Sequence, residues 1–285
     1  MAGTSDMFWA SAVSERVDTR EAVREAAAAI QAARSGTPDL VIAFVSPHHA
    51  AAYDRIGGWV RDAIGEVTFI GASATGVIGG GRELEGREGL SLTAAFLPDA
   101  RISAFSVAAP PGDGSREAWV QALEIAPDDR RTCLVLIDPK TCDSESLLRT
   151  LDSALPKGLK IGGLASPYGD GPAALFAAES VQRGGALLCL LDGAFETQSV
   201  VAQGCRPIGE PLIVTRVKGN VIRELNAGKP TEVLRKLYET LDGRDHALFN
   251  SSLFLGLEMQ GKQGQLQQGD FLIRNILGID TEAGA

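Results

Sequence analysis

The residues with the clearest chemical potential lie in the short segment GlyCysArgProIleGly, residues 204–209. The planar guanidinium of Arg206, held in a glycine-rich turn, suits bidentate binding of a carboxylate. The same cation favours the thiolate form of Cys205, which could make this cysteine reactive. A catalytic cysteine also needs a positioned base, and the chain holds only three histidines. We therefore expect Arg206 and Cys205 to contact a ligand, and we expect no catalytic residue.

Hydroxyl and amide side chains offer further ligand contacts. Ser73 and Thr75 lie at a glycine turn after one apolar run, and Ser166 lies at a similar turn later in the chain. Asn250 stands where a later strand is expected to begin. We expect a small anionic or zwitterionic ligand whose polar groups are bound by Ser73, Thr75 and Asn250.

Two other motifs favour structural roles. The glycines at 79–81 follow an apolar run, but the dinucleotide fingerprint and the P-loop lysine are absent, so we expect a tightly turning loop. His48 and His49 are adjacent and would point in different directions, and only His246 remains elsewhere. We expect these two histidines to start a solvated helix and to bind no metal. The sequence therefore predicts neither a cofactor nor a metal site.

Composition excludes several classes of partner. The chain carries 27 Lys+Arg against 36 Asp+Glu, a formal net charge of −9, which disfavours binding to nucleic acid. No apolar run approaches the roughly 20 residues that span a bilayer, and the first residues lack a signal-peptide pattern. We expect a cytoplasmic protein with no membrane partner. The cysteines show no metal-binding spacing and indicate a reduced protein; they are Cys133, Cys142, Cys189 and Cys205.

Several of the candidate residues lie in a pattern of apolar runs and glycine turns that occurs twice along the chain. Apolar runs at 39–47 and 132–140 each end at a proline, and Pro139 follows Pro47 by 92 residues. The glycine turns at 70–76 and 161–167 repeat at nearly the same distance, since Ile161 follows Ile70 by 91 residues. A constant offset across a strand, a helix and a turn indicates an internal duplication. We expect a ligand cleft between the two copies.

Periodicity and turn residues predict the individual elements. We expect helices at 18–35, about 48–64, about 115–125 and 231–241, strands at 40–45, 67–70, 90–97, 101–107, 253–259 and 271–277, and a hairpin at 212–225. Strands 90–97 and 101–107 are expected to pair with each other, and 71–89 is expected to be a loop. The predicted fold class is α/β: two tandem β-rich α/β repeats, 1–110 and 111–203, followed by a third α/β segment from residue 204.

Several of these stretches resemble one known family. Residues 9–14 with the helix at 18–35, residues 70–81, residues 201–225 and residues 271–280 are similar to segments of FIST domain proteins. The match covers nearly the whole chain and is most specific at 201–225. The resemblance divides the chain into an N-terminal FIST region, 1–203, and an incomplete C-terminal FIST region, 204–285.

The resemblance implies an intracellular ligand-sensing domain of signal transduction. Its ligands would be amino acids or similar small polar molecules, and its partner would be a signalling protein. Two alternatives belong to other classes. One is a cysteine-dependent hydrolase that uses Cys205, and the other is a protein-interaction scaffold without a ligand.

Overall fold

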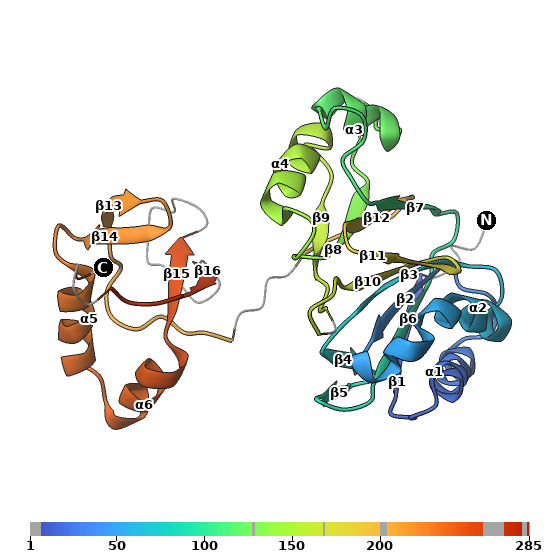
Figure 1. Cartoon of the computed structure of the whole chain (residues 1–285), viewed down its shortest axis with the longest axis horizontal. Helices are drawn as coiled ribbons and strands as arrows, with labels where there is room; N and C mark the ends of the chain where they lie inside the picture. The colour runs from blue at the N-terminus through green and yellow to red at the C-terminus, as the bar shows by residue number, and fades with distance from the viewer. Residues whose placement is uncertain are drawn as a thin grey trace, which may run out of the picture. The chain divides into compact units, whose positions relative to one another are not determined.

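The structure is a computed structural model that describes residues 7–126, 129–167, 169–199, 204–258, 271–280 and 284. The chain divides into two compact units, Met1–Gln198 and Ser199–Ala285 (Figure 1). Within the described residues, no helix combines the length and the apolar character needed to cross a bilayer.

The first sheet of unit 1 has six strands. Their order is β1 (Phe8–Ser14), β6 (Leu90–Phe96), β2 (Leu40–Val45), β3 (Thr68–Ser73), β10 (Ala174–Ala177) and β11 (Ser180–Arg183). Because β6 is antiparallel to both β1 and β2, and β3 is parallel to β2, the strands β1, β2 and β3 end at the same edge of the sheet. One face is covered by α1 (Thr19–Ala33), the 3₁₀ helix η1 (Pro47–Ala52) and α2 (Tyr53–Ile64).

The second sheet of unit 1 has four strands. Their order is β7 (Arg101–Val107), β12 (Ala186–Asp192), β8 (Thr132–Ile137) and β9 (Lys160–Leu164). Helices α3 (Arg116–Ala122) and α4 (Ser144–Ala154) bury one face of this sheet through an apolar cluster that includes Trp119 and Leu151.

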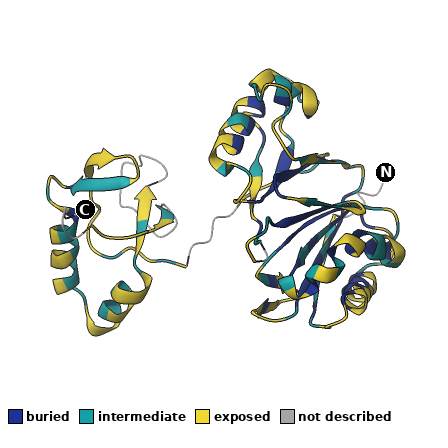
Figure 2. Cartoon of the chain, viewed as in Figure 1, coloured by how far each residue is buried: buried dark blue, intermediate teal, exposed yellow. Residues whose placement is uncertain are grey.

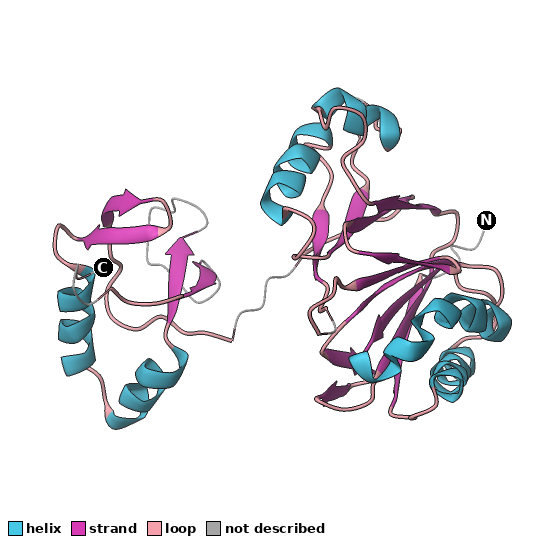
Figure 3. Ribbon diagram, viewed as in Figure 1, coloured by secondary structure: helices cyan, strands magenta, loops and turns pink. Residues whose placement is uncertain are grey.

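The remaining faces of the two sheets pack against each other. Ile70 and Ala95 of the first sheet share a buried cluster with Leu136 and Leu187 of the second. Unit 1 is therefore layered as helices, sheet, sheet and helices (Figure 3). The darkest, most buried strands in Figure 2 lie in these inner layers.

The two sheets share one topology, which confirms the predicted tandem α/β repeats. In each half, the first strand pairs with the last, the last with the second, and the second with the third. The predicted pairing of 90–97 with 101–107 was wrong, because β6 and β7 belong to different sheets. The chain passes from one sheet to the other between Phe96 and Arg101.

Two further differences concern hairpins of unit 1. The predicted loop at 71–89 contains a hairpin of β4 (Gly76–Gly79) and β5 (Arg82–Glu85). Its counterpart in the second half is the β10–β11 hairpin, which crosses over and pairs with β3 of the first sheet.

Unit 2 is built from short elements. They are β13 (Val214–Lys218), β14 (Val221–Leu225), α5 (Pro230–Glu239), α6 (Gly243–Ser252), β15 (Phe254–Glu258) and β16 (Phe271–Asn275). The predicted hairpin at 212–225 is confirmed by the antiparallel pairing of β13 with β14. Asn250 does not open a strand, because it lies inside α6. The segment 260–269, between the predicted strands 253–259 and 271–277, falls outside the described residues.

Candidate functional site

Buried polar side chains gather where the parallel strands of the first sheet end. Ser14 ends β1, Ser46 follows β2 and Ser73 ends β3, and each is only 1% exposed. In open α/β sheets, ligands bind outside the carboxyl ends of such strands. We call this region the carboxyl edge.

The β4–β5 hairpin covers the carboxyl edge. Val77 of β4 and Leu84 of β5 are buried. A Cβ on Gly79 would lie 2.5 Å from the carbonyl oxygen of Ala12 in β1, so the glycine allows a close approach of two backbones. The glycine-rich motif thus packs the hairpin onto the sheet, in agreement with a tightly turning segment.

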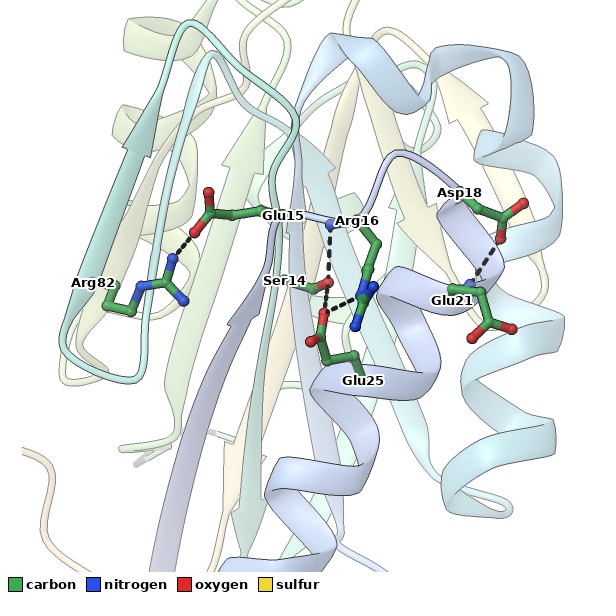
Figure 4. Close-up of polar contacts among 7 residues, drawn as sticks. All are labelled: Ser14, Glu15, Arg16, Asp18, Glu21, Glu25 and Arg82. Carbon is green, nitrogen blue, oxygen red and sulfur yellow. Dashed lines mark hydrogen bonds and ion pairs between the residues drawn. The ribbon is translucent and has the colours of Figure 1, made fainter.

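Ion pairs attach this hairpin and the following loop to the end of β1. Glu15 contacts the guanidinium groups of both Arg82 and Arg87. The Glu15–Arg82 pair is drawn in Figure 4, where the two side chains point toward one another.

A second polar cluster lies on the α1 side of Ser14 (Figure 4). The Ser14 hydroxyl donates to the Glu25 carboxylate, and the same carboxylate lies 3.3 Å from Nε of Arg16. The Arg16 amide donates to the Ser14 hydroxyl at 3.2 Å. These contacts satisfy Ser14, whose hydroxyl is therefore occupied within the protein.

His49, unlike Ser14, has a buried polar atom that lacks a hydrogen-bond partner among the described residues. It is 1% exposed, and its Nδ1 lies 2.9 Å from the Thr19 hydroxyl at the start of α1. Its Nε2 is buried and has no hydrogen-bond partner within the described residues. Burial lowers the pKa of His49, against a smaller opposing effect of the Glu88 carboxylate, so the ring is neutral. The predicted solvated position was wrong for His49, whereas His48 is exposed.

The two glycine turns that carry predicted site residues meet directly. The Ser73 hydroxyl donates to the Ser166 carbonyl at 2.7 Å and accepts from the Ala174 amide at 3.0 Å. The Ser166 amide donates to the Ser73 carbonyl at 2.9 Å. Because both capacities of the Ser73 hydroxyl are used, this residue joins the two halves. Thr75 is exposed, with its hydroxyl 3.5 Å from that of Ser166.

The other predicted site residues lie in unit 2. Arg206 forms an ion pair with Asp245, whose hydrogen bond and charge raise the pKa of the guanidinium. Arg206 is 56% exposed, whereas the Asp245 side chain is 13% exposed. Cys205 is half-buried and Asn250 is exposed on α6. The structure thus brings Ser73, Thr75 and Ser166 together, and it shows Arg206 already paired within unit 2.

Unit 1 also has an open hollow of about 830 Å³ in its second half, where β7 and β8 begin and β12 ends. Its lining includes the charged residues Arg101, Lys157 and Asp192 and the rings of Phe105 and Phe195. Helix α3 has 7 residues where its counterpart α1 has 15, so it covers less of the sheet. None of the predicted ligand residues lines this hollow.

The sequence reasoning overlooked Ser14, Ser46 and Thr19, and it misjudged His49. A signal for the serines existed, since Ser14 and Ser46 stand directly at the ends of apolar runs, as Ser73 does. The burial of His49 depends on Thr19, 30 residues earlier, and had no local signal. Within the described ranges, no three His, Cys, Asp or Glu side chains gather in a way that could hold a metal ion.

Comparisons with known proteins match most of the chain to one family and to several relatives. The model of the FIST N domain family matches residues 39–228. An uncharacterized protein of Mycobacterium tuberculosis (strain H37Rv) is 33% identical over 275 residues, which cover 96% of this chain and 70% of the relative. An uncharacterized protein of Mycobacterium bovis is 29% identical over 270 residues, covering 94% of this chain and 69% of the relative.

Proposed function

This chain belongs to the FIST domain family, a sensory family of signal transduction, and we propose that it senses a small polar ligand in the cytoplasm. The ligand is an amino acid or a similar zwitterion, and it binds at the carboxyl edge of the first sheet, beneath the β4–β5 hairpin. A signalling protein reads the bound state.

The observation that carries this proposal is the unpartnered Nε2 of His49. A buried polar atom without a hydrogen bond costs about 1–3 kcal/mol. A ligand that supplies the missing partner recovers that free energy, so this atom favours binding more than its satisfied neighbours do. A neutral imidazole offers either a donor or an acceptor at Nε2, according to which nitrogen carries the proton. It can therefore bind a carboxylate or an ammonium group.

The β4–β5 hairpin provides the conformational response. In this proposal the hairpin moves to let a ligand reach His49, whose Nε2 is buried. The contacts of Glu15 with Arg82 and Arg87 hold the hairpin and its loop in the closed position. A ligand that binds one hairpin position more tightly shifts the population toward it. That shift is the signal in this proposal.

The other ligand contacts predicted from the sequence fall at two places, the carboxyl edge and unit 2. Thr75 is exposed just after β3, beside Ser166, and can bind a polar group of the ligand. Arg206, with Cys205 and Asn250, remains a separate proposed carboxylate contact in unit 2. A carboxylate there would compete with Asp245 for the guanidinium.

Thermal shift and calorimetry with a panel of amino acids and small carboxylates test the proposal. A true ligand raises the melting temperature, since it binds the folded state alone. His49→Leu should weaken its binding at least about tenfold, or 1.4 kcal/mol, whereas the exposed control His48→Leu should not. Two further variants test whether the ligand binds elsewhere. Arg206→Ala tests unit 2, and Arg101→Ala tests the 830 Å³ hollow. Binding that survives His49→Leu and is lost in either arginine variant would show that the ligand binds at that arginine and not at the carboxyl edge.

The hydrolase alternative has a direct test. FIST domains are sensory domains rather than catalytic ones. A thiol-reactive substrate analogue should label Cys205 no faster than a simple alkylating agent does. Selective labelling of Cys205 that is lost in Cys205→Ser would instead favour an enzyme.

A further inference from the structure

Within the part of the chain that the structure describes, one edge of the second sheet has no strand beside it. Strand β9 ends the order β7–β12–β8–β9, and within the described residues it pairs only with β8. The equivalent strand of the first sheet is β3, and its outer side is occupied by β10 in antiparallel orientation. The two sheets therefore differ at this one position.

The equivalence of β3 and β9 extends to single residues. A Cβ on Gly71 of β3 would lie 2.3 Å from the carbonyl oxygen of Ala43, and a Cβ on Gly162 of β9 would lie 1.8 Å from that of Val135. Each glycine thus packs against the neighbouring parallel strand at the same place. Since β3 accepts a further strand, β9 has the backbone form to accept one.

The hydrogen-bonding groups of β9 alternate between β8 and the open edge. Leu159 accepts from Cys133, and Ala165 donates to Ile137, so the odd-numbered residues bond to β8. Strand geometry then directs the amide and carbonyl groups of Lys160, Gly162 and Leu164 outward. An unpaired row of this kind is a template for another strand.

Natural edge strands usually carry a charge or a proline that prevents pairing, and β9 has neither at its centre. Residues 161–164 are uncharged, with Ile161 42% and Leu164 60% exposed. The only charged residue, Lys160, folds its ammonium inward to Asp152 and to the carbonyls of Leu155 and Gly158. The edge is therefore apolar and open.

We propose that a second copy of this chain occupies this edge, with the two β9 strands antiparallel about a twofold axis at Gly162. In this register Gly162 pairs with Gly162 of the other copy, and Lys160 pairs with Leu164. These are the outward-facing residues, so each pair exchanges two backbone hydrogen bonds.

The side chains fit the same register. Ile161 stands opposite Gly163, where a Cβ would meet no atom within 4 Å, so each isoleucine finds open space on the other strand. The absence of charge at 161–164 lets two copies approach despite the net charge of −9. The pairing continues the four-stranded sheet across the axis, as twofold dimers commonly do.

Sedimentation equilibrium of the whole chain over a range of concentrations tests the proposal. We expect a reversible dimer whose dissociation constant rises at least about tenfold in Ile161→Lys, because two lysines would lie near the axis. Val17→Lys is the matched control, since Val17 is 76% exposed and distant in sequence, and it should dimerise like the natural chain. A chain that stays monomeric into the millimolar range, or a dimer unaffected by Ile161→Lys, would overturn the proposal.

Cross-linking tests the register itself. In the double variant Ile161→Cys with Gly163→Cys, the two positions face each other as a non-hydrogen-bonded pair with Cα atoms about 4.5 Å apart, a separation that a disulfide can bridge. Mild oxidation should give a covalent dimer in the double variant and much less in either single variant. Equal cross-linking in all three would show that the strands do not meet in this register.

Discussion

Individual residues at equivalent places in the two halves of unit 1 perform the same structural task. Ser46 follows β2 and Asp138 follows β8, and both precede a proline. The Ser46 amide donates to Gly89 at 2.8 Å, and the Asp138 amide donates to Gly185 at 2.9 Å. Each half thus places one buried polar residue at the end of its second strand, where it fixes the start of its last strand.

Asp138 makes more side-chain hydrogen bonds than Ser46 does, so its replacement should lower the free energy of unfolding more. Its carboxylate accepts from the Thr141 hydroxyl at 2.6 Å and from the Ala173 amide at 3.1 Å, and it is 0% exposed. Asp138→Ala leaves the buried Ala173 amide unpaired and removes the contact with the exposed Thr141, and we expect a loss of roughly 1–3 kcal/mol. Urea unfolding measures it, with the exposed Asp170→Ala as the control. A loss no greater than that of the control would show that the network contributes nothing.

His49 should make stability depend on pH. Burial keeps the pKa of the folded imidazole below its ordinary value of 6.5. Between these two values the unfolded chain binds a proton that the folded chain does not. Stability is therefore full above about pH 6.5 and falls as the pH drops toward the folded pKa, by up to about 1.4 kcal/mol per pH unit. Unfolding curves from pH 7.5 to 5.5 should show this slope in the natural chain and in His48→Gln, but not in His49→Gln.

At the scale of elements, the equivalent strands β3 and β9 each contain a glycine that packs closely against the neighbouring parallel strand. Gly162→Ala places a Cβ 1.8 Å from the Val135 carbonyl, so β9 must move away from β8. We expect a loss of about 1–3 kcal/mol or more. Gly163→Ala is the matched control one residue later, because its Cβ would meet nothing within 4 Å, and it should be close to neutral. Thermal melts of both variants decide the comparison, and equal losses would refute the steric explanation.

Elements with strong local signals could be predicted from the sequence, whereas their partners could not. The helix at 18–35 has a capping aspartate and a regular apolar spacing, and the structure places α1 there. The pairing of 90–97 with 101–107 followed from adjacency alone. Phe96 and Arg101 are close in sequence, but β6 buries its residues between β1 and β2, which only the assembled sheet determines.

The contacts of the candidate site could likewise be predicted only in part from the sequence. The doubled glycine turns led to the expectation that Ser73 and Ser166 would line a ligand cleft, and the structure shows these two residues hydrogen-bonded to each other. The burial of His49 could not be predicted, since its contact with Thr19 brings together η1 and α1, 30 residues apart in sequence. The pairing of Arg206 with Asp245, 39 residues later, had no local signal either.

The whole molecule divides its apolar core unevenly between the two units. The buried clusters of unit 1 join both sheets and four helices. In unit 2, the described strands β13 and β15 are largely exposed, and Leu225 is the buried apolar residue of the β13–β14 hairpin. Because burial of apolar surface is the main stabilising contribution to folding, unit 1 should hold nearly all of the stability.

Hydrogen exchange on the whole chain measures this difference directly. Amides exchange through local openings whose free energy reaches the global value only in well-packed elements. We expect β2, β6 and β12 to exchange most slowly, since their residues are almost all buried, and we expect the unit 2 amides to exchange orders of magnitude faster. A chain of residues 1–198 alone should keep the same protected strands and the same main melting transition. Equal protection of β13 and β12 in the whole chain would mean that unit 2 is buried by contacts beyond those described for it.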